Sequence, residues 1–209
     1  MQNKILTIIE LLGKEHSLTF FSRQKPFKVL ISVILSQRTR DENTLIASKK
    51  LFSRFDTAKK LANADISEVK KLIKQSGFYN VKAKRIKEVS KILLEKYNGK
   101  VPHELNKLLK LPGVGRKTAN CTLVYGFNIP AIPADTHVHR ISNRLGIVKT
   151  KTPEQTEHEL MRKLPRKYWI NINELFVKHG QTICSPIKPK CDKCPITKIC
   201  DFKKLPKDI

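Results

Sequence analysis

The sequence predicts an all-α protein. Apolar residues recur at intervals of three and four positions through nearly every segment, which is the spacing of one face of a helix. No segment shows convincing alternation of apolar and polar residues, and no sequence signal for a β-hairpin turn is present. Helix-forming residues, chiefly Lys, Leu, Ile and Glu, dominate the composition, and only 8 of the 209 residues are glycine.

The first three predicted helices can be taken in chain order. Lys4–Leu12 carries four apolar residues at helical spacing, which indicates one buried face. A second helix should begin at a capping box formed by Asp65 and Glu68 and stop at Gly77. A third should cover Asn80–Tyr97. The buried positions expected are Ile5, Ile8, Ile9 and Leu12 in the first helix, and Val81, Ile86, Val89, Leu93 and Tyr97 in the third.

Two more helices are predicted in the C-terminal half. Thr152–Gln155 is a second capping box, with proline at the first helical position. Trp169–Lys178 has helical periodicity and should end at Gly180. The last stretch, Cys184–Ile209, is rich in Cys, Pro and Lys and has little periodicity. We therefore expect something other than a hydrophobic core to order it.

The charge balance points to a polyanionic partner. The chain has 42 Lys and Arg against 18 Asp and Glu, a net charge of +24. Such an excess repels itself and suits nucleic acid, although a basic ribosome-like protein or a merely solvated surface is the alternative. No apolar run approaches the ~18–20 residues that span a membrane, and Glu10 interrupts the N-terminal run without a cleavage site after it. We expect no membrane partner and an intracellular, cytoplasmic protein, whose cysteines stay reduced.

Four of the five cysteines predict a metal centre. Cys184, Cys191, Cys194 and Cys200 lie within 17 residues, separated by six, two and five positions. A loop this short can place all four thiolates around one centre. Structural zinc usually takes two close pairs of ligands, and here only the middle two form such a pair, so we favour a [4Fe–4S] cluster over zinc or free thiols. Cys121 lies in a helical pattern and is expected to be a core residue.

The segment Leu111–Ala119 predicts an anion site. Pro112 should end the preceding helix, and Gly113 and Gly115 allow a tight turn whose N–H groups point outward. A helix should begin at about Arg116, so that its positive end faces the same place. Together these features suit a DNA phosphate, and an ordinary corner between two helices is the alternative.

Lys117 is the candidate nucleophile. It lies in the first turn of that helix, where the helix N-terminus and Arg116 both disfavour a charged amine, so its pKa should fall. A fall from ~10.4 to ~8 would raise the free amine at pH 7 from about 0.04% to about 10%. Such an amine can attack a sugar C1′ and form a Schiff base. The alternative is that Lys117 is an ordinary solvated surface lysine.

Asp135 is the candidate catalytic carboxylate. Its simplest role is the N-cap of the next helix, and an aspartate aimed at the sugar could also stabilise oxocarbenium charge and help deprotonate the lysine. His137 and His139 follow it as phosphate contacts or as polar helix positions.

Three motifs in this order resemble the endonuclease III family of helix–hairpin–helix DNA glycosylases. They are the hairpin Leu111–Ala119, the Pro-Ala-Asp-Thr-His segment with its aspartate eighteen positions after Lys117, and the 6-2-5 cysteine spacing. The resemblance runs over nearly the whole chain. Further segments that fit the family pattern are Leu35–Asp41 and Gly77–Asn80 with Lys82 and Ala83.

The resemblance implies a fold and an activity. Two helical domains would flank a DNA-binding groove: a six-helix domain over 20–129 with the helix–hairpin–helix motif, and an iron–sulfur cluster domain from 1–19 and 130–209. The enzyme would be a monomeric, bifunctional glycosylase and AP lyase. It would act on double-stranded DNA with damaged pyrimidines or abasic sites, removing oxidised pyrimidines and cutting the abasic strand by β-elimination. Lys117 matches the Schiff-base lysine and Asp135 the catalytic aspartate.

The resemblance also implies DNA contacts. Gln37 matches a residue that fills the gap left by the flipped nucleotide. Phe78 stands where the family usually has a leucine wedge, and its larger ring should still separate bases but alter the preference for the opposite base. Lys188 and Lys190 lie in a loop that touches the DNA backbone in the family. Further expected contacts are Gly113, Gly115, Arg116 and His137.

Three other functions compete with this interpretation. Monofunctional relatives that excise adenine or thymine from mismatches generally lack the lysine, and the adenine type usually has an extra C-terminal domain, whereas this chain stops nine residues after Cys200. A non-catalytic hairpin module would not need Asp135 at its spacing from Lys117. Ferredoxin-like electron carriers tend to be small and acidic, which a charge of +24 fits badly.

Overall fold

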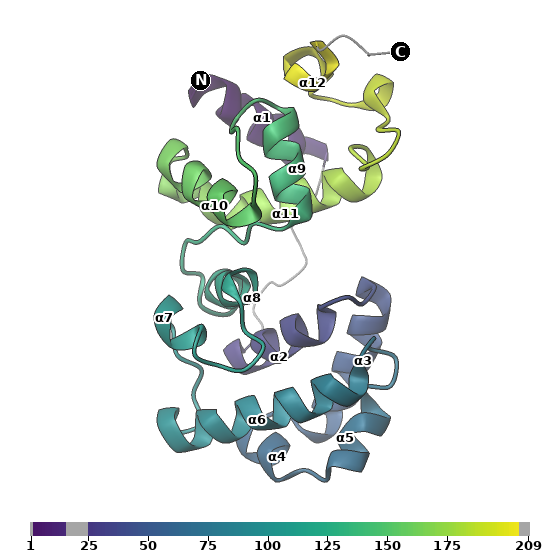
Figure 1. Cartoon of the computed structure of the whole chain (residues 1–209), viewed down its shortest axis with the longest axis vertical. Helices are drawn as coiled ribbons and strands as arrows, with labels where there is room; N and C mark the ends of the chain where they lie inside the picture. The colour runs from purple at the N-terminus through teal and green to yellow at the C-terminus, as the bar shows by residue number, and fades with distance from the viewer. Residues whose placement is uncertain (1, 16–24, 205–209) are drawn as a thin grey trace. The chain divides into compact units, whose positions relative to one another are not determined.

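The computed structural model describes residues 2–15 and 25–204 (Figure 1). Over these two ranges the chain forms helices joined by turns and loops and contains no strand, which confirms the predicted all-α class. The chain divides into two compact units, Met1–Phe20 with Pro130–Ile209 and Phe21–Ile129. None of the helices in the described ranges has both the length and the apolar character that crossing a membrane demands.

The first unit is built around helix α11. Its helices are α1 (Gln2–Glu15), α9 (Thr136–Arg144), α10 (Pro153–Lys163), α11 (Trp169–Thr182) and α12 (Asp201–Lys204), with short 3-10 turns at Arg166–Tyr168, Cys191–Lys193 and Thr197–Ile199. Helices α1 and α9 pack on α11, and α10 packs on α9 (Figure 1). The predicted face of α1 is confirmed, because Ile5, Ile8, Ile9 and Leu12 are all buried in this core.

The same core reaches into the cysteine-rich segment. Ile196 lies between two of the cysteines and is only 1% exposed, packed with the core residues of the first unit. The expectation that something other than a core orders this segment is therefore wrong at this position. A single isoleucine in a segment without periodicity gave no pattern from which its burial could be predicted.

The second unit is built around helix α2. Its elements are α2 (Pro26–Ser36), α3 (Asp41–Arg54), α4 (Ala58–Asn63), α5 (Ile66–Leu72), α6 (Tyr79–Tyr97), α7 (Leu105–Leu108), α8 (Arg116–Cys121) and a π-helix (Thr122–Gly126). Helix α2 contacts α3, α6, α8 and the π-helix. Cys121 is buried against Val29 and Val33 of α2, which confirms it as a core residue.

Two predicted helix ends are wrong. Helix α5 stops at Leu72 rather than Gly77, because the chain then turns and Ser76 donates a hydrogen bond of 2.9 Å to the carbonyl oxygen of Leu35. Helix α11 continues through Gly180 to Thr182. A Cβ at Gly180 would lie 2.3 Å from Nδ1 of His137, so this glycine makes room for helix α9 instead of ending α11.

The buried face of α6 differs from the predicted one by one position. Val81 is 54% exposed, whereas its neighbour Lys82 is only 3% exposed. The face that packs inward carries Lys82 because four oxygen atoms of the second unit accept hydrogen bonds from its ammonium group and take the place of water. Tyr97 is half-buried, and the stripe residues confirmed as buried are Ile86, Val89 and Leu93.

Candidate active site and metal centre

The predicted hairpin turn lies between α7 and α8. Gly113 has φ +72°, in the left-handed region, and a Cβ on it would lie 2.0 Å from Cδ of Arg85. Gly115 has φ −88° and ψ 179°, which any residue adopts, and its Cβ would meet nothing within 4 Å. The positive φ therefore favours glycine at 113, where a Cβ would also displace the side chain of Arg85, whereas the bare backbone at 115 faces open space. Helix α8 begins at Arg116, as predicted.

Lys117 lies in the first turn of α8 with its side chain exposed. The helix that carries it is anchored by its other face, where Thr118, Ala119 and Asn120 are buried, and α8 packs on α2. The amine thus extends from a short, firmly packed helix directly behind the hairpin turn.

Asp135 is the N-cap of α9, as predicted. Its Oδ1 accepts hydrogen bonds of 2.9 Å from the backbone N–H groups of His137 and Val138. The segment before it is held by Asn173, whose side-chain amide donates a bond of 2.6 Å to the carbonyl oxygen of Pro133. The carboxylate is therefore held by the first backbone N–H groups of α9, and the segment that precedes it is held by Asn173.

The two histidines of α9 contact other side chains of the first unit. His137 is half-buried, and its Nδ1 lies 3.1 Å from Nη2 of Arg140. His139 has its Nδ1 2.7 Å from the hydroxyl of Thr156 on α10. The packing role of His139 follows from this contact, and the DNA contact expected of His137 stays a prediction.

Gln37 follows α2 and is joined to the hairpin. Its Nε2 donates to the carbonyl oxygen of Gly113 at 2.9 Å and to the hydroxyl of Thr118 at 3.2 Å. Its Oε1 accepts a hydrogen bond of 3.3 Å from Arg85. The second unit therefore brings together two of the segments that the sequence marked separately.

Phe78 begins α6 from a left-handed backbone conformation, with φ +59°. Its side chain is 61% exposed, and the guanidinium carbon of Arg38 lies 5.7 Å from the centre of its ring. Arg38 also has a left-handed backbone, with φ +52°. A large apolar ring held out toward solvent beside a cation is suited to contact a base and a phosphate together.

Two basic residues of α6 were missed as parts of this region. Lys82 bonds to the segment that carries Gln37, and Arg85 lies beneath Gly113 and bonds to Gln37. The signal was present in the sequence, because Lys82 stands four positions before Ile86 and so shares its helical face. Lys82 was named as fitting the family pattern, but no buried role was predicted for it.

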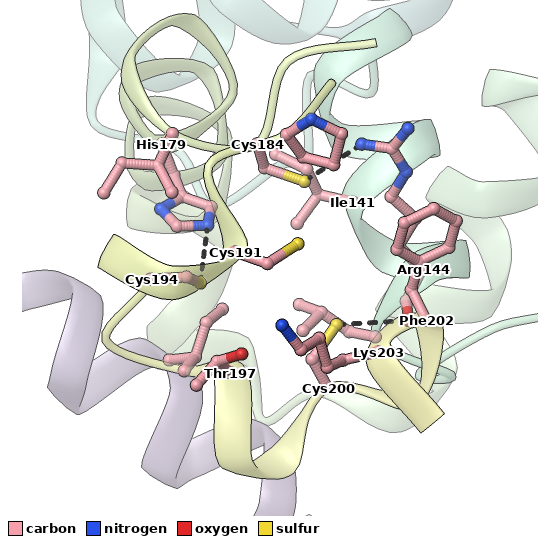
Figure 2. Close-up of a pocket in the computed structure, with 14 residues that line it drawn as sticks. Ile141, Arg144, His179, Cys184, Cys191, Cys194, Thr197, Cys200, Phe202 and Lys203 are labelled. Atoms are coloured by element: carbon pink, nitrogen blue, oxygen red, sulfur yellow. Dashed lines mark hydrogen bonds between the residues drawn. The ribbon is translucent and has the colours of Figure 1, made fainter. Parts of the chain in front are cut away.

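The four cysteines of the predicted cluster line one pocket of the first unit, with an empty volume of ≈ 400 Å³ that includes open solvent. Figure 2 shows their sulfur atoms around one open space. Burial is the main cause that raises the pKa of the Cys194 thiol, the neighbouring thiols add to it, and a backbone hydrogen bond from Ile196 opposes it. Sulfur ligands in a largely apolar pocket are the environment of a structural metal centre.

The spacing of the sulfurs bears on the choice of metal. One zinc ion bonds each thiolate at ~2.3 Å, so its four sulfurs must lie within about 3.8 Å of one another. In the two described ranges, no three His, Cys, Asp or Glu side chains are arranged to hold a single metal ion. A cubane of iron and sulfide is larger and takes its four thiolates from around its periphery. The donor set and the open space between the sulfurs fit such a cluster.

Two side chains contact the cysteine sulfurs directly. Nη1 of Arg144 donates to Sγ of Cys184 at 3.3 Å, and Nε2 of His179 lies 3.7 Å from Sγ of Cys194 (Figure 2). The guanidinium of Arg144 also donates to the carbonyl oxygens of Ser185 and Pro186, at 2.7 and 2.8 Å. The loop after Cys184 is thus fixed by hydrogen bonds from α9.

The same loop carries the two predicted phosphate contacts. Lys188 and Lys190 are both exposed, and Lys188 has a left-handed backbone with φ +53°. The hydroxyl of Ser185 donates to the carbonyl oxygens of Ile187 and Lys188. The backbone N–H of Lys190 donates to the carbonyl oxygen of Ile183. Ile187, directly before Lys188, is 81% exposed. The loop presents two ammonium groups from a hydrogen-bonded backbone.

Comparisons of the sequence agree with the motifs. The family described as HhH-GPD superfamily base excision DNA repair protein matches residues 31–166. Endonuclease III of Thermotoga maritima is 57% identical over 177 residues, which cover 85% of this chain and 83% of that protein. Endonuclease III of Rickettsia conorii is 42% identical, with 84% of each chain covered.

Comparisons of the structure give the same answer. The structure of a trapped endonuclease III–DNA covalent intermediate matches with a TM-score of 0.89 at 32% identity, covering 98% of this chain and 97% of that one. A thermostable thymine-DNA glycosylase matches with a TM-score of 0.86 at 25% identity, covering 97% and 96%. The chain therefore belongs to the endonuclease III family within the HhH-GPD superfamily of base excision DNA repair proteins.

Proposed function

We propose that this chain, a DNA glycosylase and AP lyase by its family, removes oxidised pyrimidines from double-stranded DNA and cuts the abasic strand through a Schiff base on Lys117. The observation that carries the proposal is an exposed lysine in the first turn of a packed helix, directly behind an exposed glycine turn. The 32% identical endonuclease III that was trapped in a covalent intermediate with DNA supports covalent chemistry.

The proposed reaction has two stages. The free amine of Lys117 attacks C1′ of the damaged nucleotide, and the base leaves with the bonding electrons and takes up a proton. The C1′–O4′ bond then opens as O4′ takes the proton that the lysine nitrogen loses, and the resulting iminium joins enzyme and sugar. Loss of a C2′ proton then expels the 3′ phosphate, and water releases the enzyme. Asp135 stabilises the positive charge that develops on the sugar as the base departs, and it assists removal of the lysine proton. Its two backbone hydrogen bonds hold the carboxylate in one orientation.

DNA is held by several groups in this proposal. The N–H groups at Gly113 and Gly115, with Arg116, bind a phosphate, and the open space at Gly115 supports a close approach of the backbone. Gln37 and Phe78 fill the gap that the flipped nucleotide leaves. The remaining backbone contacts are made by His137, Lys188 and Lys190. A net charge of +24 favours such a partner.

The four cysteines hold a [4Fe–4S] cluster in this proposal. When bound, the cluster supplies a covalent link among four points of a short segment. Its role is to fix the loop that carries Lys188 and Lys190, together with the hydrogen bonds from Arg144.

A panel of duplexes tests the proposed substrates. Duplexes with thymine glycol, uracil, a G·T mismatch, A·8-oxoguanine and an abasic site are incubated with the full chain, and base release and strand cleavage are measured separately. We expect base release from thymine glycol, and strand cleavage at both thymine glycol and the abasic site. Release of thymine from G·T without strand cleavage would instead identify a monofunctional mismatch glycosylase.

A further inference from the structure

The ammonium group of Lys82 is buried in the second unit. The residue is 3% exposed, and Nζ donates to the carbonyl oxygens of Leu35 and Gln37 at 2.7 and 2.5 Å. It also donates to the hydroxyls of Thr39 and Ser76 at 2.8 and 2.9 Å. Lysine is almost never buried unless its protons are satisfied, and here four neutral oxygens surround three protons. Burying an ammonium group in this way costs free energy. The packing of α6 does not need it, because isoleucine and leucine already form the buried face of this helix.

Three of the four oxygens belong to two separate loops, and the fourth, the carbonyl oxygen of Leu35, belongs to the last turn of α2. One loop, residues 37–40, follows α2 and carries Gln37, and the other, residues 73–78, precedes α6 and carries Phe78. The loops also touch each other: the N–H of Gly77 donates to the hydroxyl of Thr39 at 3.0 Å. A Cβ at Gly77 would lie 2.9 Å from the carbonyl oxygen of Arg38. The two backbones therefore meet directly, and Lys82 binds both of them.

Each loop contains a backbone conformation that a non-glycine residue adopts at a cost. Arg38 has φ +52° and Phe78 has φ +59°. Left-handed residues of this kind persist only where surrounding contacts fix them, and they are frequent where a protein holds a side chain ready for a ligand. Arg38 directly follows Gln37, and Phe78 itself carries the exposed ring. Both loops are bound by the ammonium group of Lys82.

We propose that Lys82 is a positioning residue for base flipping, which fixes the Gln37 loop and the Phe78 loop in the geometry that fills the gap in DNA. The proposal rests on the proposed function, in which these two side chains replace the flipped nucleotide. Preorganised loops lose less conformational entropy when they bind, so their filling of the gap is stronger. The four oxygens that accept from Lys82 lie outside the hairpin turn and outside α8, so its effect should be larger on extrusion of the base than on the chemistry at the sugar.

The chain offers a matched control. Lys87 is also on α6, and its ammonium donates to the carbonyl oxygens of Ala62 and Ala64, away from both loops. Lys82→Met removes a buried ammonium group, and Lys87→Met removes a partly buried one. Both groups bind backbone oxygens. A loss of stability is common to both variants, and only Lys82→Met releases the loops.

The test uses the full chain with its metal centre loaded, at a temperature where each variant is folded. The first readout is the fluorescence of 2-aminopurine placed opposite a non-cleavable tetrahydrofuran abasic analogue, which reports insertion into the stack. The second is single-turnover base release from a thymine glycol duplex, and the third is cleavage of a preformed abasic duplex. For Lys82→Met we expect most of the fluorescence change to be lost and base release to fall about tenfold or more, with cleavage of the abasic duplex falling about threefold or less. Lys87→Met should match the wild-type protein in all three.

Two results would overturn the proposal. One is a Lys82→Met protein that behaves like Lys87→Met, and the other is an equal fall in base release and abasic cleavage, which indicates a general loss of structure. If Lys82→Met does not fold, Thr39→Val decides, because it removes one acceptor of Lys82 and of Gly77 while it keeps the lysine. It should lower the fluorescence change and slow base release about threefold without affecting abasic cleavage, and unchanged fluorescence and base release would reject the role. If the wild-type protein releases no base, the proposed substrate is wrong, but fluorescence at the abasic analogue still decides the role of Lys82.

Discussion

The side-chain amide of Gln37 donates a hydrogen bond of 2.9 Å to the carbonyl oxygen of Gly113. This bond joins the loop after α2 to the turn between α7 and α8, which lie 76 residues apart in the sequence. The same side chain accepts a bond from Arg85, whose side chain occupies the space beside Gly113. The group proposed to fill the gap in DNA and the turn proposed to bind its phosphate are therefore one hydrogen-bonded structure, so a change in the turn should also reach Gln37.

The two glycines of the turn should respond differently to alanine. Gly113→Ala places a Cβ 2.0 Å from Arg85 on a residue with φ +72°, and we expect it to lower the free energy of unfolding by about 1–3 kcal/mol. Gly115→Ala should fold normally, since its Cβ meets nothing within 4 Å, but it should weaken binding to an abasic-analogue duplex about tenfold. Urea unfolding and a binding titration on both variants measure this. Normal binding by Gly115→Ala would remove that backbone from the DNA interface.

Lys117→Ala should abolish covalent trapping. Borohydride reduces the Schiff base between a lysine and an abasic sugar, so the wild-type chain incubated with an abasic duplex should give an adduct that migrates as protein plus DNA. Lys59→Ala, which removes an exposed lysine of α4, is the matched control and should give the wild-type amount of adduct. An undiminished adduct with Lys117→Ala would mean that another amine is the nucleophile.

Two substitutions of Asp135 should separate its capping role from its catalytic role. Asparagine caps helices as well as aspartate does, so Asp135→Asn should keep the stability of α9 while it slows base release about a hundredfold. Asp135→Ala should slow the reaction similarly and in addition lower the free energy of unfolding by about 1 kcal/mol. Thermal unfolding and single-turnover base release on both variants distinguish the roles. A fully active Asp135→Asn protein would leave this residue with the helix cap alone.

The sequence predicted most of the helices because their patterns are local. The apolar face of α1, the start of α8 at Arg116 and the cap at Asp135 each depend on residues within one or two turns of one another. The clustering of the four cysteines in one pocket was also predictable, because a segment of 17 residues cannot carry them far apart.

What the sequence could not predict depends on contacts between distant segments. Gly180 was expected to end α11, but a glycine is present there because His137 of α9 leaves no room for a Cβ. Lys82 was named only as fitting the family pattern, and its burial depends on oxygens from residues that lie up to 47 positions away. Ile196 joins a core whose other members lie in α1, α9, α10 and α11 and in the loops between them. Helical periodicity places Lys82 on the face of Ile86, but it carries no information on the oxygens that bind this lysine or on the other two contacts.

The basic loop of the first unit should contribute to DNA binding without sequence preference. Removal of one lysine that binds a phosphate should reduce the slope of log binding constant against log salt by about 0.9. We therefore expect Lys188→Ala and Lys190→Ala each to lower the slope by about one unit and to weaken binding to damaged and undamaged duplexes alike. Lys59→Ala is again the control, because it lies in the second unit on α4. A slope unchanged by both loop variants would exclude the loop from the interface.

Loss of one cysteine ligand should release the metal, and the fifth cysteine provides the control. Cys194→Ser replaces a soft thiolate with a poor ligand in a pocket whose other donors are sulfurs, so the purified variant should have lost most of its iron and its visible absorbance. Cys121→Ala lies in the core of the second unit and should keep both at the wild-type level, with a loss of only about 1 kcal/mol in stability.

Because Arg144 and Ser185 already bond the loop backbone, the metal-free variant should keep part of its affinity for DNA. Iron content, the absorbance spectrum and DNA affinity are measured on the same preparations. Zinc in place of iron in the wild-type chain would contradict the proposed cluster, and equal iron in both variants would contradict the assignment of Cys194 as a ligand.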